Sequence, residues 1–98
     1  MPHFILTYDL ASDYLERRGQ FRAEHLKLAW EAADKGALLL GGAVGDPPES
    51  AQLLFSDGAA AEAFANADPY VAQGLVKKWR VRPWATVVGR DAATPVRP

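Results

Sequence analysis

Residues 13–35 read DYLERRGQFRAEHLKLAWEAADK, and their apolar positions recur with the period of an amphipathic helix. If each residue turns the helix by about 100°, His25 falls near the middle of the apolar face, with Arg22 close beside it. Most of the charged side chains crowd the opposite side. Gly19 weakens the helix, so we expect a break or kink there. The stretch therefore predicts a long first helix that points a histidine toward the core.

The sequence on both sides of this helix indicates strands. Residues 3–8 are rich in aromatic and β-branched side chains, which favour a strand. After Gly36, an expected helix C-cap, residues 37–43 read ALLLGGA and are apolar on both faces. A strand that is covered on both sides has this composition. Residues 51–55 follow the turn at 45–48 and are the expected antiparallel partner of that strand.

The second half predicts one more helix and one more strand. Residues 59–66 form a short helix that Asp57 can cap. Its inward face is expected to hold Ala60, Ala63, Phe64 and Ala67. Pro69 ends this segment, because proline disfavours the helical conformation of the residue before it. Residues 76–83 alternate in polarity and predict the fourth strand, which residues 84–88 extend or follow with a short fifth one.

The order of these elements is β-α-β-β-α-β, which is the split β-α-β or ferredoxin-like unit of the α+β class. It predicts a four-stranded antiparallel sheet with the helices on one face. Residues 1–88 are expected to form the domain, and residues 89–98 a flexible C-terminal tail with little apolar surface to bury. Since residues 37–43 need cover on a second face that this short chain cannot supply, we expect a homodimer formed through the bare face of the sheet.

Composition excludes several classes of protein. The chain has 98 residues, a formal net charge of −1 and no cysteine, so one domain without disulfides is expected. A near-neutral charge argues against a nucleic-acid partner, and no apolar run approaches the roughly 20 residues of a membrane span. No signal peptide is visible, so we expect a cytoplasmic protein. Two histidines and scattered carboxylates offer too few ligands for a metal centre, and we expect no metal and no cofactor.

The candidate site follows from His25. A buried imidazole needs a hydrogen-bond partner, and the best candidate is Asp68, in the sequence Ala67-Asp68-Pro69-Tyr70. A histidine held by a carboxylate has a fixed tautomer and can move a proton. Two simpler interpretations remain open: His25 can be a core residue that is hydrogen-bonded for structure alone, and an aspartate before proline commonly ends a helix.

Several segments together resemble the YCII-related (YciI-like) family. They are Arg22-x-x-His25-Leu26, the run from Gly36 to Gly42, the Ala67–Tyr70 motif and Arg82-Pro83-Trp84. The resemblance implies a dimeric α+β barrel with a His–Asp dyad, which maps onto His25 and Asp68. A relative of this group is associated with dehydrohalogenation of a chlorinated aromatic breakdown product, so the implied reaction class is elimination or isomerisation.

Two functions from different classes are therefore expected as alternatives. The first is a small lyase or isomerase that acts on a small carbonyl-containing acid, with Arg22, Tyr70 and Gly42 as the substrate-binding residues. The second is a non-catalytic domain that binds a small metabolite or a partner and dimerises through its sheet. A cleft that reaches the imidazole would favour the first, and a sealed His25 the second.

Overall fold

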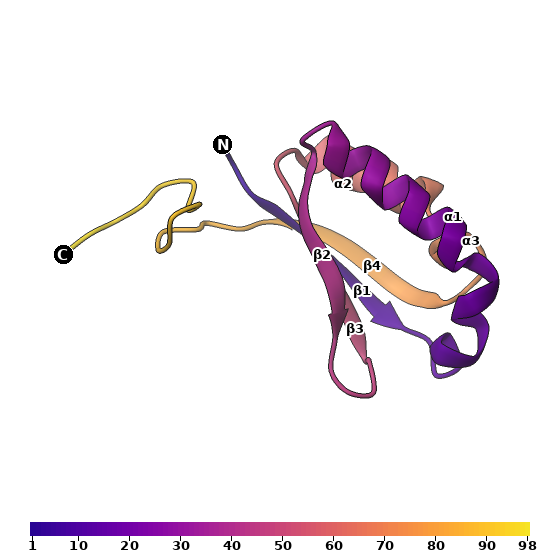
Figure 1. Cartoon of the computed structure of the whole chain (residues 1–98). Helices are drawn as coiled ribbons and strands as arrows, with labels where there is room; N and C mark the ends of the chain where they lie inside the picture. The colour runs from indigo at the N-terminus through magenta and orange to yellow at the C-terminus, as the bar shows by residue number, and fades with distance from the viewer.

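Four strands form one antiparallel sheet in the computed structural model, which describes residues 1–98. The strands are β1 (Phe4–Leu10), β2 (Leu38–Val44), β3 (Ser50–Phe55) and β4 (Val76–Pro83), and their order in the sheet is β2-β3-β1-β4. The helices are α1 (Tyr14–Asp34), α2 (Gly58–Ala67) and the short α3 (Pro69–Ala72). All three helices cover the same face of the sheet (Figure 1). The ferredoxin-like α+β fold predicted from the sequence is confirmed.

The helix ends agree with most of the expected signals. Asp57 accepts a hydrogen bond from the backbone N–H of Ala59 at 3.3 Å and caps α2. Gly36 has a φ of +81°, a conformation that glycine adopts without steric cost, and it turns the chain after α1. Of the break or kink expected at Gly19, the break is absent, because α1 is continuous from its first residue to its last.

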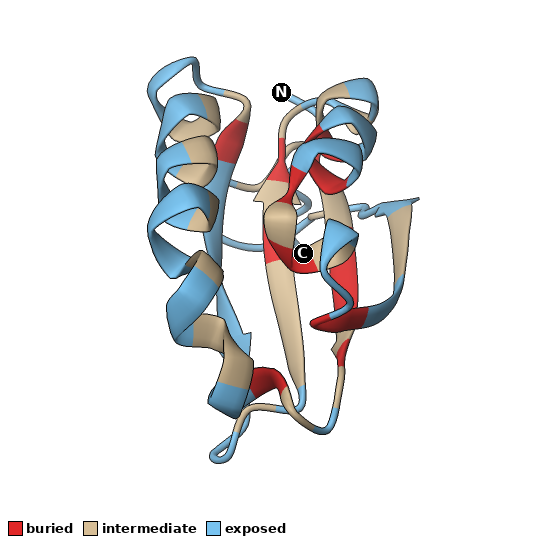
Figure 2. Ribbon diagram, turned by 90° about the vertical axis from the view of Figure 1, so that its right-hand side faces the viewer, coloured by how far each residue is buried: buried red, intermediate tan, exposed pale blue.

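The core lies between the sheet and the helices. Leu6 and Tyr8 on β1 and Phe55 on β3 have almost no exposed surface and point toward the helix layer. Figure 2 shows the buried residues along the inner strands and α2, whereas α1 is largely exposed or half-buried. The inward face predicted for α2 was wrong by about one residue, since its buried members are Ala61, Phe64 and Ala65.

The edge strand β2 differs most from the expectation. Only Leu38 is buried in this strand, and the rest is exposed in the single chain. The reason is that α1 lies over β2 without closing onto it and leaves a cavity between them. The apolar character of this strand therefore has two sources. Residues 38–43 contribute to the cavity lining. Leu40 and Val44, which pair with Leu54 and Ser50, also leave 74 % and 50 % of their surfaces exposed on the bare face of the sheet.

The C-terminal segment leaves the body of the domain. β4 ends at Pro83, and residues 84–88 neither extend it nor form a fifth strand. The tail folds back on itself, with backbone hydrogen bonds from Thr94 to Thr86 and from Val96 to Val87. Figure 1 shows this segment projecting away from the helices.

No helix in the structure combines the length and apolarity that a membrane crossing requires.

Candidate active site

Asp68 lies at the junction of α2 and α3, where the extended backbone required before Pro69 turns the chain. Its carboxylate is completely buried. Oδ1 accepts hydrogen bonds from Nδ1 of His25 at 2.9 Å and from the backbone N–H of Tyr70 at 3.0 Å. Because a carboxylate only accepts, the contact assigns the imidazole proton to Nδ1. The structure thus brings His25 and Asp68 together.

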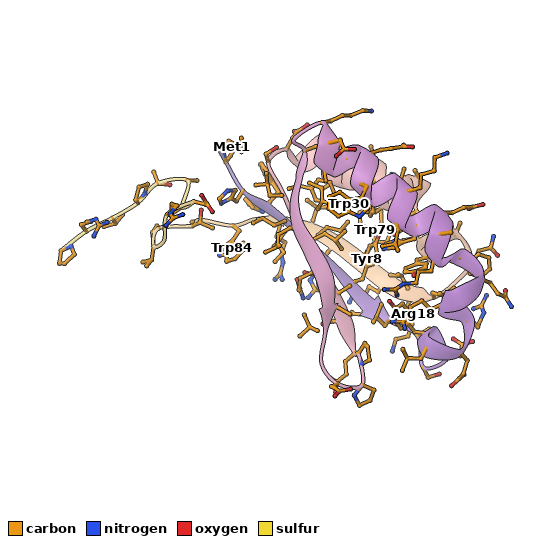
Figure 3. All side chains as sticks on the ribbon, viewed as in Figure 1. Met1, Tyr8, Arg18, Trp30, Trp79 and Trp84 are labelled. Atoms are coloured by element: carbon orange, nitrogen blue, oxygen red, sulfur yellow. The ribbon has the colours of Figure 1, made fainter.

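The second carboxylate oxygen has a partner that sequence reasoning missed. Oδ2 of Asp68 accepts a hydrogen bond from the hydroxyl of Tyr8 at 2.7 Å. Tyr8 is 1 % exposed and lies between α1 and the sheet (Figure 3). Burial, followed by the nearby Asp68 carboxylate, raises the pKa of the Tyr8 phenol well above its ordinary value. Strand alternation indicated that this ring faces inward, but it carried no signal for the partner of the hydroxyl.

Tyr70 stacks face to face on the imidazole of His25, with ring centroids 3.9 Å apart and the planes within 5° of parallel. Its ring meets Tyr14 edge to face at 5.7 Å. The Tyr70 hydroxyl is buried and has no hydrogen-bond partner within the chain. Burial is the main cause that raises the pKa of Tyr70 to about 12, while the positive charge of Arg22 acts in the opposite direction. A buried donor without a partner is uncommon and is suited to hydrogen-bonding a ligand.

A cavity of about 390 Å³ separates α1 from the sheet and reaches the imidazole. Arg22, His25, Gly42 and Tyr70, four of the five residues predicted for the site, line this cavity. Asp68 lies behind the imidazole, outside the lining. Most other lining residues are apolar, and the side chain of His25 retains 16 % of its exposed surface. A small molecule in the cavity can therefore approach the imidazole.

The two adjacent glycines of β2 differ in their surroundings. A Cβ built on Gly41 would lie 3.3 Å from Cγ of Leu53, which is tighter than an ordinary contact. A Cβ on Gly42 would meet nothing within 4 Å. Gly41 pairs with Leu53 and packs closely on the helix side of the sheet. Gly42 pairs with Gln52, whose side chain bonds Thr7 on the opposite face, so the open space at Gly42 lies on that bare face.

The remaining histidine takes no part in this arrangement. Nδ1 of His3 lies 2.7 Å from the hydroxyl oxygen of Thr86, at the opposite end of β1 from the cavity residue Leu10. The structure contains no group of three or more His, Asp or Glu side chains placed to hold a metal ion.

Comparison with known proteins identifies a matching family and solved structures of similar fold. The family model of the YCII-related domain matches residues 1–85. The fold is similar to that of 5-chloro-2-hydroxyhydroquinone dehydrochlorinase (TftG) from Burkholderia phenoliruptrix, solved in complex with 2,5-dihydroxybenzoquinone. The TM-score is 0.63 at 20 % identity, over 86 % of this chain and 93 % of that one.

A protein from Agrobacterium tumefaciens is also similar in fold, with a TM-score of 0.58 at 14 % identity over 95 % of this chain and 98 % of that one. At these identities the two likenesses establish a shared fold. A sequence search of curated proteins gave no match. The family model spans both the α1 segment with His25 and the junction with Asp68, and the chain belongs to the YCII-related domain family.

Proposed function

We propose that the protein is a small enzyme of the lyase or isomerase type, in which His25 moves a proton on a small carbonyl-containing acid. One observation carries the proposal: the imidazole faces a cavity of about 390 Å³ while its Nδ1 is held at 2.9 Å by a fully buried carboxylate. This arrangement fixes the tautomer and leaves Nε2 without a hydrogen bond inside the chain.

The free nitrogen can act as a general base. Nε2 takes a proton from a carbon next to the substrate carbonyl, and the electrons of the broken C–H bond form an enolate. In an elimination these electrons then form a carbon–carbon double bond and expel a leaving group such as halide. In an isomerisation the proton returns to a different carbon. The resulting imidazolium is stabilised by the ionised carboxylate of Asp68.

Negative charge develops on the substrate oxygen during this step, and two groups are suited to meet it. Arg22 lines the cavity one turn before His25 and carries a permanent positive charge. The hydroxyl of Tyr70 is a donor without a partner. Gly42 belongs to the cavity lining, where the substrate can lie against the backbone of β2. Arg22 and Tyr70 would hold the substrate oxygen, and Gly42 would contact the rest of the substrate.

The related fold of TftG supports this reaction class by analogy. That protein is a dehydrochlorinase and was solved with a quinone, a molecule with carbonyl oxygens on a planar ring. For this chain, the analogy favours a compact, largely apolar substrate that carries an acidic oxygen, which agrees with the mostly apolar lining of the cavity.

Assembly as a homodimer through the bare sheet face is part of the proposal. Leu40 and Val44 on β2 are 74 % and 50 % exposed. Such apolar side chains on a sheet face are typical of an interface. In the dimer they would be covered by the sheet of a second copy, which would also supply the second cover that the apolar sequence of β2 predicts.

The alternative is a domain that binds a small metabolite without turnover. Its support is the structural role of Asp68, which caps α3 and hydrogen-bonds Tyr8 whether or not any chemistry follows. Under this alternative the cavity holds a ligand and His25 only contributes a hydrogen bond.

A substrate panel distinguishes the two functions. Small carbonyl-containing acids, with and without a halide leaving group, are incubated with the protein, and halide release and isomer formation are followed by NMR. Turnover that is lost in His25→Ala and Asp68→Asn supports the enzyme. The matched control is His3→Gln, which changes the only other histidine. Binding without turnover across the panel contradicts the proposal and favours the alternative.

A further inference from the structure

The hydroxyl of Tyr8 donates a hydrogen bond to Oδ2 of Asp68, the carboxylate oxygen that does not contact His25. Neither the sequence motifs nor the family resemblance assign Tyr8 a role. Its hydroxyl is 2.7 Å from Oδ2, which is the shortest of the three hydrogen bonds to this carboxylate. The residue comes from the middle of β1, the central strand that pairs with both β3 and β4. Because β1 is hydrogen-bonded to a strand on each side, the Tyr8 hydroxyl holds a fixed position relative to the Asp68 side chain at the helix junction.

The three hydrogen bonds to the Asp68 carboxylate are divided between its two oxygens. Oδ1 receives two of them, from the imidazole of His25 and from the backbone N–H of Tyr70. These two bonds constrain only one of the two oxygens. The bond from Tyr8 to Oδ2 constrains the other and so restricts rotation of the carboxylate about its Cβ–Cγ bond. Oδ1 can then stay aimed at Nδ1, which is the condition for a fixed imidazole tautomer.

We propose that Tyr8 is a positioning residue of the site: its hydroxyl fixes the Asp68 carboxylate and thereby the orientation and basicity of His25. The proposal deepens the proposed function, because it gives the His–Asp pair a third member. Tyr8 acts through Asp68 and transfers no proton itself. Hydrogen bonding to Oδ2 also takes up part of the negative charge that would otherwise stabilise the imidazolium.

This charge effect predicts the direction in which a variant of Tyr8 changes the hydrogen bond between His25 and Asp68. In Tyr8→Phe the ring remains, but Oδ2 loses its donor and the buried carboxylate depends more on His25. The hydrogen bond from Nδ1 of His25 to Oδ1 then strengthens, and the NMR resonance of the Nδ1 proton moves downfield. A ring-fluorinated tyrosine at the same position is a stronger donor to Oδ2, weakens the bond from His25 and moves this resonance upfield. The other titratable or charged groups on the elements around the imidazole are unchanged in both variants; they are Tyr14, Arg18, Arg22, Asp68 and Tyr70.

The chain offers a matched control in the adjacent residue. Thr7 is 4 % exposed, and its hydroxyl donates to Oε1 of Gln52 at 2.8 Å on the opposite face of the sheet. Thr7→Val therefore removes a buried hydroxyl and one hydrogen bond from the same strand without touching the carboxylate. Its loss of stability should resemble that of Tyr8→Phe, and the resonance of its His25 Nδ1 proton should match that of the parent protein.

The experiment measures the NMR resonance of the His25 Nδ1 proton at one fixed pH in the parent chain and the three variants. Opposite shifts in Tyr8→Phe and in the fluorinated protein, with no shift in Thr7→Val, support the proposal. An unchanged resonance in the fluorinated protein, which keeps the hydroxyl and the fold, overturns it even where Tyr8→Phe does not fold. With a substrate in hand, Tyr8→Phe is expected to lower kcat about tenfold with KM unchanged, since the ring that lines the cavity is kept.

The NMR measurement needs no substrate, so it separates this proposal from the proposed function. Shifts of the Nδ1 proton resonance in a protein that turns over no acid would support Tyr8 as a positioning residue of a binding site and would contradict the proposed enzyme. Turnover that depends on His25 but does not change in the Tyr8 variants would support the proposed enzyme and contradict the positioning role of Tyr8.

Discussion

Replacing Asp68 with alanine should cost more stability than any other single change at a polar residue of this chain. The carboxylate has no exposed surface and accepts three hydrogen bonds. Two of its donors, the Tyr8 hydroxyl and the Tyr70 backbone N–H, are themselves buried. Each buried donor left without a partner costs about 1–3 kcal/mol, so Asp68→Ala should lose about 2–6 kcal/mol. The imidazole of His25 is partly exposed, and water can replace its lost partner.

Asp68→Asn should cost less than Asp68→Ala, since the amide keeps an acceptor oxygen for two of the donors. A loss of about 1–3 kcal/mol is expected, because the amide nitrogen cannot accept from Tyr8. The control is Asp57→Ala, which removes another helix-capping aspartate at the protein surface and should cost about 1 kcal/mol.

Urea unfolding followed by tryptophan fluorescence measures these differences at one fixed protein concentration, because any dimer makes apparent stability depend on concentration. The expected order of loss is Asp68→Ala, then Asp68→Asn, then Asp57→Ala. The reasoning is refuted if Asp68→Ala is no more destabilising than Asp57→Ala, since the buried donors would then need no carboxylate.

The other predictions concern pH, assembly and the tail. Burial raises the pKa of Tyr70 from 10.0 to about 12, so the folded chain holds a proton that the unfolded chain releases. The resulting stability is present below pH 10 and is lost as the pH rises toward 12. Tyr70→Phe should reduce this alkaline loss in unfolding experiments and leave the part that comes from the buried phenol of Tyr8. Leu40→Glu should convert the proposed dimer to a monomer in sedimentation at micromolar concentration; a parent chain that is already monomeric would contradict the interface. Truncation after Gly89 should change the free energy of unfolding by less than about 0.5 kcal/mol, and a larger fall would mean that the tail docks on the domain or on a second copy.

Periodicity and turn residues were enough to predict the order of the elements. The helical period extends over many residues, and several glycines and prolines lie where helices and strands end. The apolar positions of the 21-residue helix α1 define which of its faces points inward. His25 was therefore expected on the side that faces the sheet, and it lies there. Proline after Asp68 predicted the junction that turns this carboxylate toward the helix. These signals placed each residue separately, and the pairing of His25 with Asp68 rested in addition on the resemblance to the YCII-related family.

Other features depend on packing that the sequence does not encode locally. The α2 helix is short and rich in alanine, so Phe64 alone could not fix which side faces inward, and the predicted face was displaced. β2 was expected to be covered by the helix layer, but α1 leaves a cavity over it, and a helix pattern does not indicate how closely the helix approaches. The bond from Tyr8 to Asp68 joins residues 60 positions apart and follows from the packing of α2, which ends at Asp68, against β1.

The central claim is that His25 removes a proton from a bound carbonyl-containing acid. Its most direct test is hydrogen–deuterium exchange at the carbon next to the carbonyl, measured by NMR in D₂O for acids that bind the cavity. The parent chain is expected to catalyse this exchange for at least one bound acid, and His25→Ala to bind the same acid without exchange above that in buffer. Exchange that is equal in the two proteins, or bound acids that never exchange in the parent chain, would contradict the account.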